Sequence, residues 1–66
     1  MSNAVVIKEV AFAKTTLILT KDLVYKAWLR YHDHGYDSPI FTFTDEANAN
    51  CFFDRLVNIY TSVPDL

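Results

Sequence analysis

The chain has 66 residues, of which 52% are hydrophobic and 15% aromatic, and its net charge is −2 at pH 7. This length suits a single small domain, residues 1–66, and the apolar content with low net charge excludes an intrinsically disordered chain. The single cysteine, Cys51, excludes an internal disulfide and a multi-cysteine metal site. No uncharged stretch approaches the roughly 18 residues that a membrane span needs. Because so small a domain is marginally stable alone, we expect either an unusually rich core or a partner.

The N-terminus is short and polar. Ser2-Asn3-Ala4 is similar to the remnant that expression vectors leave, so we expect residues 1–4 to lie outside the fold, as disordered or expression-derived residues. No basic stretch precedes an apolar one, so no targeting signal is predicted. One cysteine and no signal favour a reducing compartment, and we expect a cytoplasmic protein.

The first third of the chain predicts two strands. Residues 5–12 are rich in β-branched side chains, and residues 15–20 form a second run of the same kind. The turn between them would be Ala13-Lys14. It lacks the Gly or Asn that two-residue hairpin turns favour, which argues against a tight two-residue loop.

Residues 23–32 fit two structures. As a strand, they alternate, with Tyr25 and Leu29 on one face and Lys26, Trp28 and Arg30 on the other. As a helix over 21–34 ending at Gly35, they would give a β-β-α-β-α order. The aromatic and β-branched content favours the strand. A turn at 33–35, closed by a glycine in the left-handed region, also favours it.

The last third predicts a strand and then a helix. Residues 39–43 alternate, with Pro39 at the first position, where a missing amide is tolerated. Thr44 is suited to cap a helix over 45–61, with Asp45 and Glu46 at the positive end of its dipole. One helix face gathers the apolar residues Ala49, Phe52, Phe53, Leu56, Ile59 and Tyr60.

Together these elements predict an α+β fold. We expect an antiparallel sheet of about four strands (5–12, 15–20, 23–32 and 39–43), packed on one face by the C-terminal helix 45–61. The sheet face toward the helix should carry Leu17, Leu19, Tyr25, Leu29, Phe41 and Phe43. The opposite, open face should carry Ile18, Lys26, Trp28, Arg30 and Thr42.

Motifs for catalysis and metal binding are weak. His32 and His34, with Asp37 nearby, could ligate a metal, but a loop rich in His and Asp is more often a solvated turn, so no metal site is predicted. Cys51 has acidic rather than basic residues near it at the helix start, which suits a partner contact better than a nucleophile. A single glycine argues against a phosphate-binding loop. We therefore expect no enzyme, no cofactor and no small-molecule substrate.

Charge is distributed unevenly along the chain. Residues 1–30 carry five basic and two acidic side chains, and residues 31–66 carry one basic and six acidic ones. The strand, turn, strand and helix order of residues 25–57, with Trp28 between Lys26 and Arg30, resembles the DNA-reading sheets of integrase arm domains. This resemblance implies nucleic-acid binding. Domains that bind nucleic acids are usually basic, however, whereas this chain has a pI near 5.4.

The surplus of Tyr and Trp over what one sheet-helix interface needs indicates a binding surface. We expect a non-enzymatic protein-interaction module that self-associates or binds a larger protein, as phage or mobile-element inhibitors of host proteins do. The alternatives are a small nucleic-acid-associated regulator and an accessory subunit of a complex. The predicted partner contacts are Lys26, Trp28, Arg30 and Tyr31, with a second, acidic contact at Asp33, Asp37, Asp45, Glu46 and Asp54.

Overall fold

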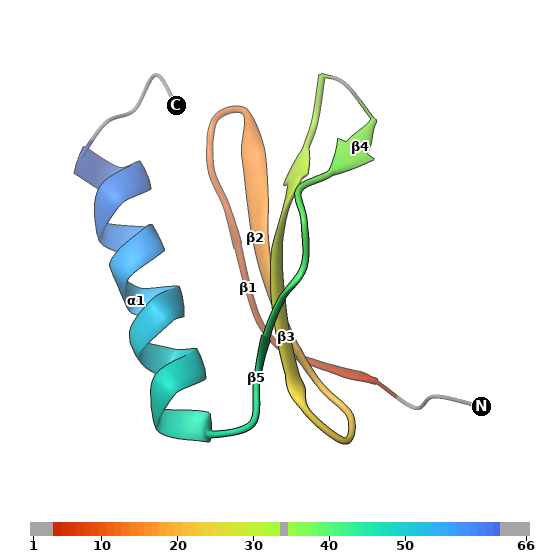
Figure 1. Ribbon diagram of the computed structural model, residues 1–66. Helices are drawn as coiled ribbons and strands as arrows, with labels where there is room; N and C mark the ends of the chain where they lie inside the picture. The colour runs from red at the N-terminus through yellow and green to blue at the C-terminus, as the bar shows by residue number, and fades with distance from the viewer. Residues whose placement is uncertain (1–3, 34, 63–66) are drawn as a thin grey trace.

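An antiparallel sheet with one helix on a single face makes up the fold. The structure is a computed structural model that describes residues 4–33 and 35–62. In chain order the elements are β1 (Val5–Ala11), β2 (Thr15–Lys21), β3 (Tyr25–Tyr31), β4 (Tyr36–Asp37), β5 (Phe41–Phe43) and α1 (Glu46–Ser62). Figure 1 shows α1 lying along one face of the sheet, with no helix on the other. The predicted α+β fold is confirmed; the expectation for residues 1–3 lies outside the described residues.

Two successive hairpins build most of the sheet. β1 pairs with β2, and β2 with β3, all antiparallel. The first connection spans residues 12–14, where the N–H of Phe12 donates to the carbonyl of Thr15 at 2.7 Å. The second spans residues 22–24 and leaves Leu23 96% exposed at its tip. The strand predicted for 23–32 therefore begins at Tyr25, because Leu23 belongs to the turn.

β3 is a strand along its whole length, so the helical alternative over 21–34 is wrong. Its register places Trp28 opposite Ile18 and Arg30 opposite Thr16 on β2. After β3 the chain reverses through Gly35, whose φ is +66°. The N–H of Gly35 donates to the carbonyl of Tyr31 at 3.2 Å. The predicted left-handed glycine is confirmed, and this is the conformation that a Cβ disfavours.

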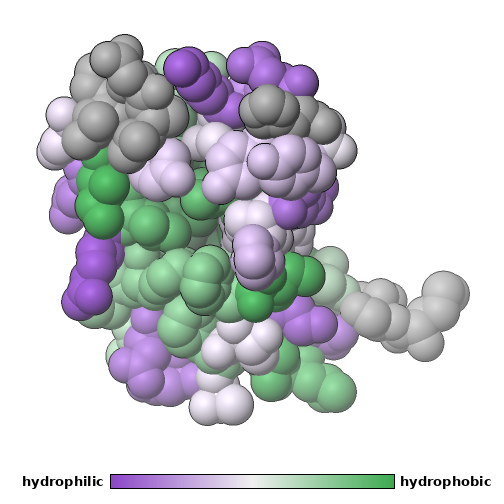
Figure 2. Space-filling model, turned by 45° about the horizontal axis from the view of Figure 1, so that its top comes forward, coloured by the Kyte–Doolittle hydropathy of each residue, from purple (hydrophilic) through white to green (hydrophobic). Residues whose placement is uncertain are grey.

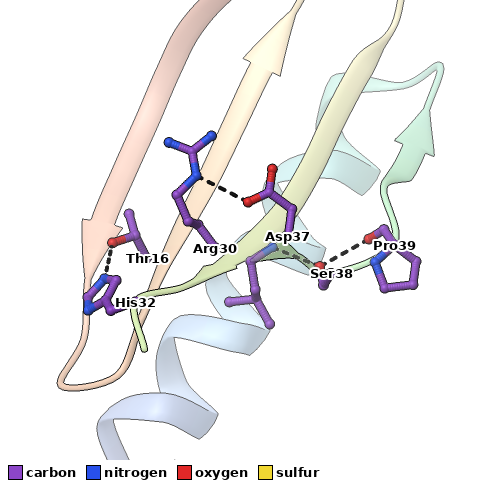
Figure 3. A network of polar contacts seen from close by, with 7 residues as sticks. Thr16, Arg30, His32, Asp37, Ser38 and Pro39 are labelled. Carbon is purple, nitrogen blue, oxygen red and sulfur yellow. Dashed lines mark hydrogen bonds and ion pairs between the residues drawn. The ribbon is translucent and has the colours of Figure 1, made fainter. Parts of the chain in front are cut away.

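The strand predicted for 39–43 is present but shorter, as β5 (Phe41–Phe43), and a two-residue strand that was not predicted, β4 (Tyr36–Asp37), precedes it. β4 pairs with β3 at Arg30 and Tyr31, and β5 pairs with it at residues 25–27. Between them, Ser38 (labelled in Figure 3) forms two hydrogen bonds with Leu29. The N–H of Leu29 donates to Ser38 Oγ at 2.9 Å. The N–H of Ser38 donates to the Leu29 carbonyl at 2.7 Å. Pro39 follows and has no N–H to continue the ladder, so pairing resumes only at Phe41.

The core lies between α1 and the sheet face that α1 covers. Its buried hydrophobic residues are Leu17, Leu19, Tyr25, Ala27, Leu29, Ala49 and Phe53. Phe52 adds a ring that stacks on Phe41 at 4.8 Å and on Phe43 at 5.2 Å between centroids. At the far end of the helix, Tyr60 stacks on Phe12 at 5.0 Å. The expected assignment of side chains to this face is confirmed.

The helix differs from expectation in two details. It begins at Glu46, and the N–H of Ala49 donates to the carbonyl of Asp45 at 3.1 Å, so Asp45 rather than Thr44 is the capping position. Ile59 is 43% exposed, while Val57 packs on the core. Ile59 lies two turns beyond Phe52, about 10 Å further along the axis, where β5 no longer lies beneath the helix.

Candidate functional site

The open face of the sheet carries Lys26, Trp28 and Arg30, as predicted from alternation. Trp28 is only half-exposed, and its indole N–H is buried without a hydrogen-bond partner among the described residues. Ile18, its cross-strand neighbour, is 4% exposed although no helix covers this face. Trp28 therefore packs along the sheet with Ile18 and presents less surface than a fully exposed ring would.

Two polar side-chain contacts also lie on this face. Arg30 Nε donates to Asp37 Oδ1 at 3.1 Å, and Thr16 Oγ1 bonds His32 Nε2 at 2.7 Å. Figure 3 shows both pairs on the side of the sheet away from the helix. Arg30 thus has an intramolecular partner, and the face carries charges of both signs.

Tyr31, the fourth predicted contact, lies on the other face of the sheet. Its ring packs against the core and stacks on Tyr36 at 5.2 Å. Side chains along a strand alternate between its two faces. Because Trp28 points to the open face, Tyr31, three residues later, points to the helix side. The four predicted partner contacts therefore do not form one surface.

The predicted acidic contact is also divided. Asp33 and Asp37 lie at the β3–β4 end of the molecule, whereas Asp45 and Glu46 lie at the start of α1, at the opposite end (Figure 1). Asp54 is exposed on the helix itself. These carboxylates cannot contact one small partner surface together.

Of the two weak candidates for metal binding, only His32 lies within the described residues. Within residues 4–33 and 35–62 no group of three His, Cys, Asp or Glu side chains could hold a metal. His32 is engaged with Thr16, and His34 lies outside the described residues.

Cys51 is free and exposed. It lies with Phe43, Phe52 and Arg55 around a shallow hollow of about 300 Å³. Figure 2 shows hydrophobic side chains gathered in the middle of one face of the molecule, with hydrophilic ones around them. The exposed apolar residues of β5 and its approach, Ile40 at 57% and Phe41 at 44%, add to the molecule's apolar surface.

A surface that the sequence reasoning missed lies at the outer edge of β1. Among the described strands none pairs with this edge, and its first three residues are apolar and open: Val5 is 63% exposed, Val6 54% and Ile7 44%. The register shifts between Val6 and Lys8, so Ile7 is the extra residue of a β-bulge. The run of β-branched residues predicted a strand, but nothing in it indicated that the strand would lie at an edge.

Beside this edge a groove separates β1 from the start of α1, because the helix packs mainly over β2, β3 and β5. The groove has a volume of about 190 Å³. Its lining residues come from four elements: Ile7, Lys8, Leu19, Lys21, Tyr25, Glu46 and Asn50. We call the outer edge of β1 and this groove together the β1 surface.

Comparison of the chain with protein-family models, with curated proteins and with solved structures finds no match. No helix in the described part of the chain is long and apolar enough to cross a membrane. The class that the fold defines is a small α+β domain whose antiparallel sheet has one helix-covered and one open face.

Proposed function

We propose that this protein is a non-catalytic protein-interaction module that binds an extended segment of a partner along β1. An open strand edge presents backbone N–H and C=O groups that a further strand can pair with, which is the basis of recognition by strand addition. The observation that carries the proposal is the exposure of Val5, Val6 and Ile7 on an unpaired edge. Long, apolar, open edges are hazards that proteins ordinarily shield.

The β1 surface supports this function better than the face around Trp28. A binding hot spot usually offers an accessible aromatic ring with its polar group available. Here the indole N–H is buried and Arg30 is held by Asp37. By contrast, β1 presents three neighbouring exposed apolar side chains beside a groove.

A random peptide library displayed on yeast, selected on the purified chain, tests the proposal. We expect enriched peptides to slow amide hydrogen exchange along β1, because new interstrand hydrogen bonds protect edge amides. The double variant Val6→Ser/Ile7→Ser should lower their affinity about tenfold or more. Leu23→Ser removes an apolar side chain that is 96% exposed elsewhere and serves as the matched control. Protection confined to other elements, or equal losses in both variants, would contradict the proposal.

A further inference from the structure

We infer that the segment bound at β1 is acidic, and that one of its carboxylate side chains enters the groove between Lys8 and Lys21. This inference rests on the proposed function and specifies the chemistry of its partner. It follows from the position of the two lysines, from their lack of anionic partners and from the geometry of an added strand.

Both lysines turn over the helix-covered face of the sheet. Lys8 Nζ lies 5.4 Å from the centroid of the Phe53 ring, and Lys21 Nζ lies 5.4 Å from that of Tyr25. Aromatic faces attract cations, so these contacts hold the two ammonium groups beside the groove. They line it from neighbouring strands, β1 and β2.

The charges of the groove are not balanced. Glu46 is its only acidic lining residue, and Glu46 Oε2 accepts a hydrogen bond from Tyr25 Oη at 2.9 Å. Within residues 4–33 and 35–62, neither lysine forms an ion pair. The groove therefore has two cations against one carboxylate that is already engaged, and it is electrostatically complementary to a further carboxylate.

The same lysines argue against a second copy of this chain as the occupant. Antiparallel pairing of β1 with β1 across a two-fold axis would place the helix-covered faces of both copies on one side of the seam. Lys8 and Lys21 of both copies would then gather beside it. A lysine that points inward on an edge strand is a known means of preventing such association.

An added strand would direct alternate side chains to opposite faces. Those on the helix side would meet Lys8 and Lys21, and those on the open side would lie beside Val6 and Glu9, whose cross-strand partners are Thr20 and Ile18. The matching segment thus alternates acidic residues with β-branched ones. Acidic residues at successive positions would bring one carboxylate beside Glu9 and reduce complementarity.

Fluorescence anisotropy with labelled eight-residue peptides tests the inference. One peptide alternates Glu with Val and Thr, and a second replaces every Glu by Gln. We expect the Glu peptide to bind about three- to tenfold more tightly at low salt, as two partly exposed charge pairs allow, and the difference to shrink near 0.5 M salt. A third peptide, N-methylated at every internal amide, should lose binding because neither of its edges can then pair with β1.

Variants of the chain test whether Lys8 and Lys21 cause the preference for the Glu peptide. Lys8→Gln/Lys21→Gln should abolish the preference for Glu over Gln, whereas Lys14→Gln/Lys26→Gln changes the net charge equally and should keep it. Equal affinity of the Glu and Gln peptides, with β1 protected by both, would overturn the acidic partner while leaving strand addition intact. If no peptide binds, if sedimentation shows a dimer, and if hydrogen exchange shows that β1 is protected in that dimer, the occupant is a second copy of the chain. That result would overturn the inference. Binding that survives N-methylation would contradict strand addition itself.

Discussion

Tyr25 Oη donates a hydrogen bond of 2.9 Å to Glu46 Oε2 and so joins the middle of the sheet to the first turn of α1. Tyr25 is 9% exposed, and its ring belongs to the core. Glu46 also lies near the positive end of the helix dipole, where an acidic side chain stabilises the helix. The bond therefore fixes where the helix starts relative to the sheet, and it forms one wall of the groove beside β1.

We expect Tyr25→Phe to lower the free energy of unfolding by about 0.5–1.5 kcal/mol, because it removes the hydrogen bond and keeps the ring. Glu46→Ala should cost a similar amount through the same bond and the lost dipole interaction. In a double-mutant cycle measured by urea unfolding, the two losses should be less than additive. Full additivity would show that the bond contributes nothing to stability.

Phe53 is the larger of the two buried residues of α1 and is 2% exposed. Phe53→Ala should cost about 3–5 kcal/mol because it leaves a cavity in the core between α1 and the sheet, and we expect loss of the cooperative thermal transition in circular dichroism. Ile59→Ala, on the same helix at 43% exposure, should cost less than about 1 kcal/mol. Comparable losses in the two variants would place Ile59 in the core and refute the packing described above.

Trp28 on the open face has a buried N–H without a described partner. Trp28→Phe keeps a ring over Ile18 and removes the unsatisfied group, so its free energy of unfolding should stay within about 1 kcal/mol of the wild type. Trp28→Ala uncovers Ile18 and should cost about 1–3 kcal/mol, below the value for a fully buried ring. Chemical denaturation of both variants measures the difference. If the Phe variant is as unstable as the Ala variant, the indole N–H has a partner.

Tyr60 gives the molecule an alkaline pH dependence. Burial of its phenol raises the pKa above the ordinary value of 10.0, and repulsion from Tyr31 adds to the effect. A pKa raised on folding contributes stability below the unfolded value and loses it as pH rises through the folded value. The urea midpoint should therefore fall above about pH 10, and less so in Tyr60→Phe. A phenol signal of Tyr60 that titrates at or below 10 in NMR would contradict this.

Local patterns predicted most of the fold. The alternation at Tyr25, Ala27 and Leu29 identified the buried side of β3, and Gly35 identified the turn that follows. The 3.6-residue period from Ala49 to Tyr60 identified α1 and its apolar face. Each of these signals is carried by neighbouring residues, because the periods of strands and helices are set by backbone geometry.

Which elements became neighbours depends on the folding of the whole chain. Strand alternation does not reveal that β1 lies at the edge, and it does not place Lys8 and Lys21 beside Glu46, which is far along the chain. It also assigns Trp28 to the open face without showing that the indole packs over Ile18. The residue pattern within each element specified its two faces. Burial of a shared core set the order of the strands and the position of the helix over them. That arrangement left some of those faces open to a partner.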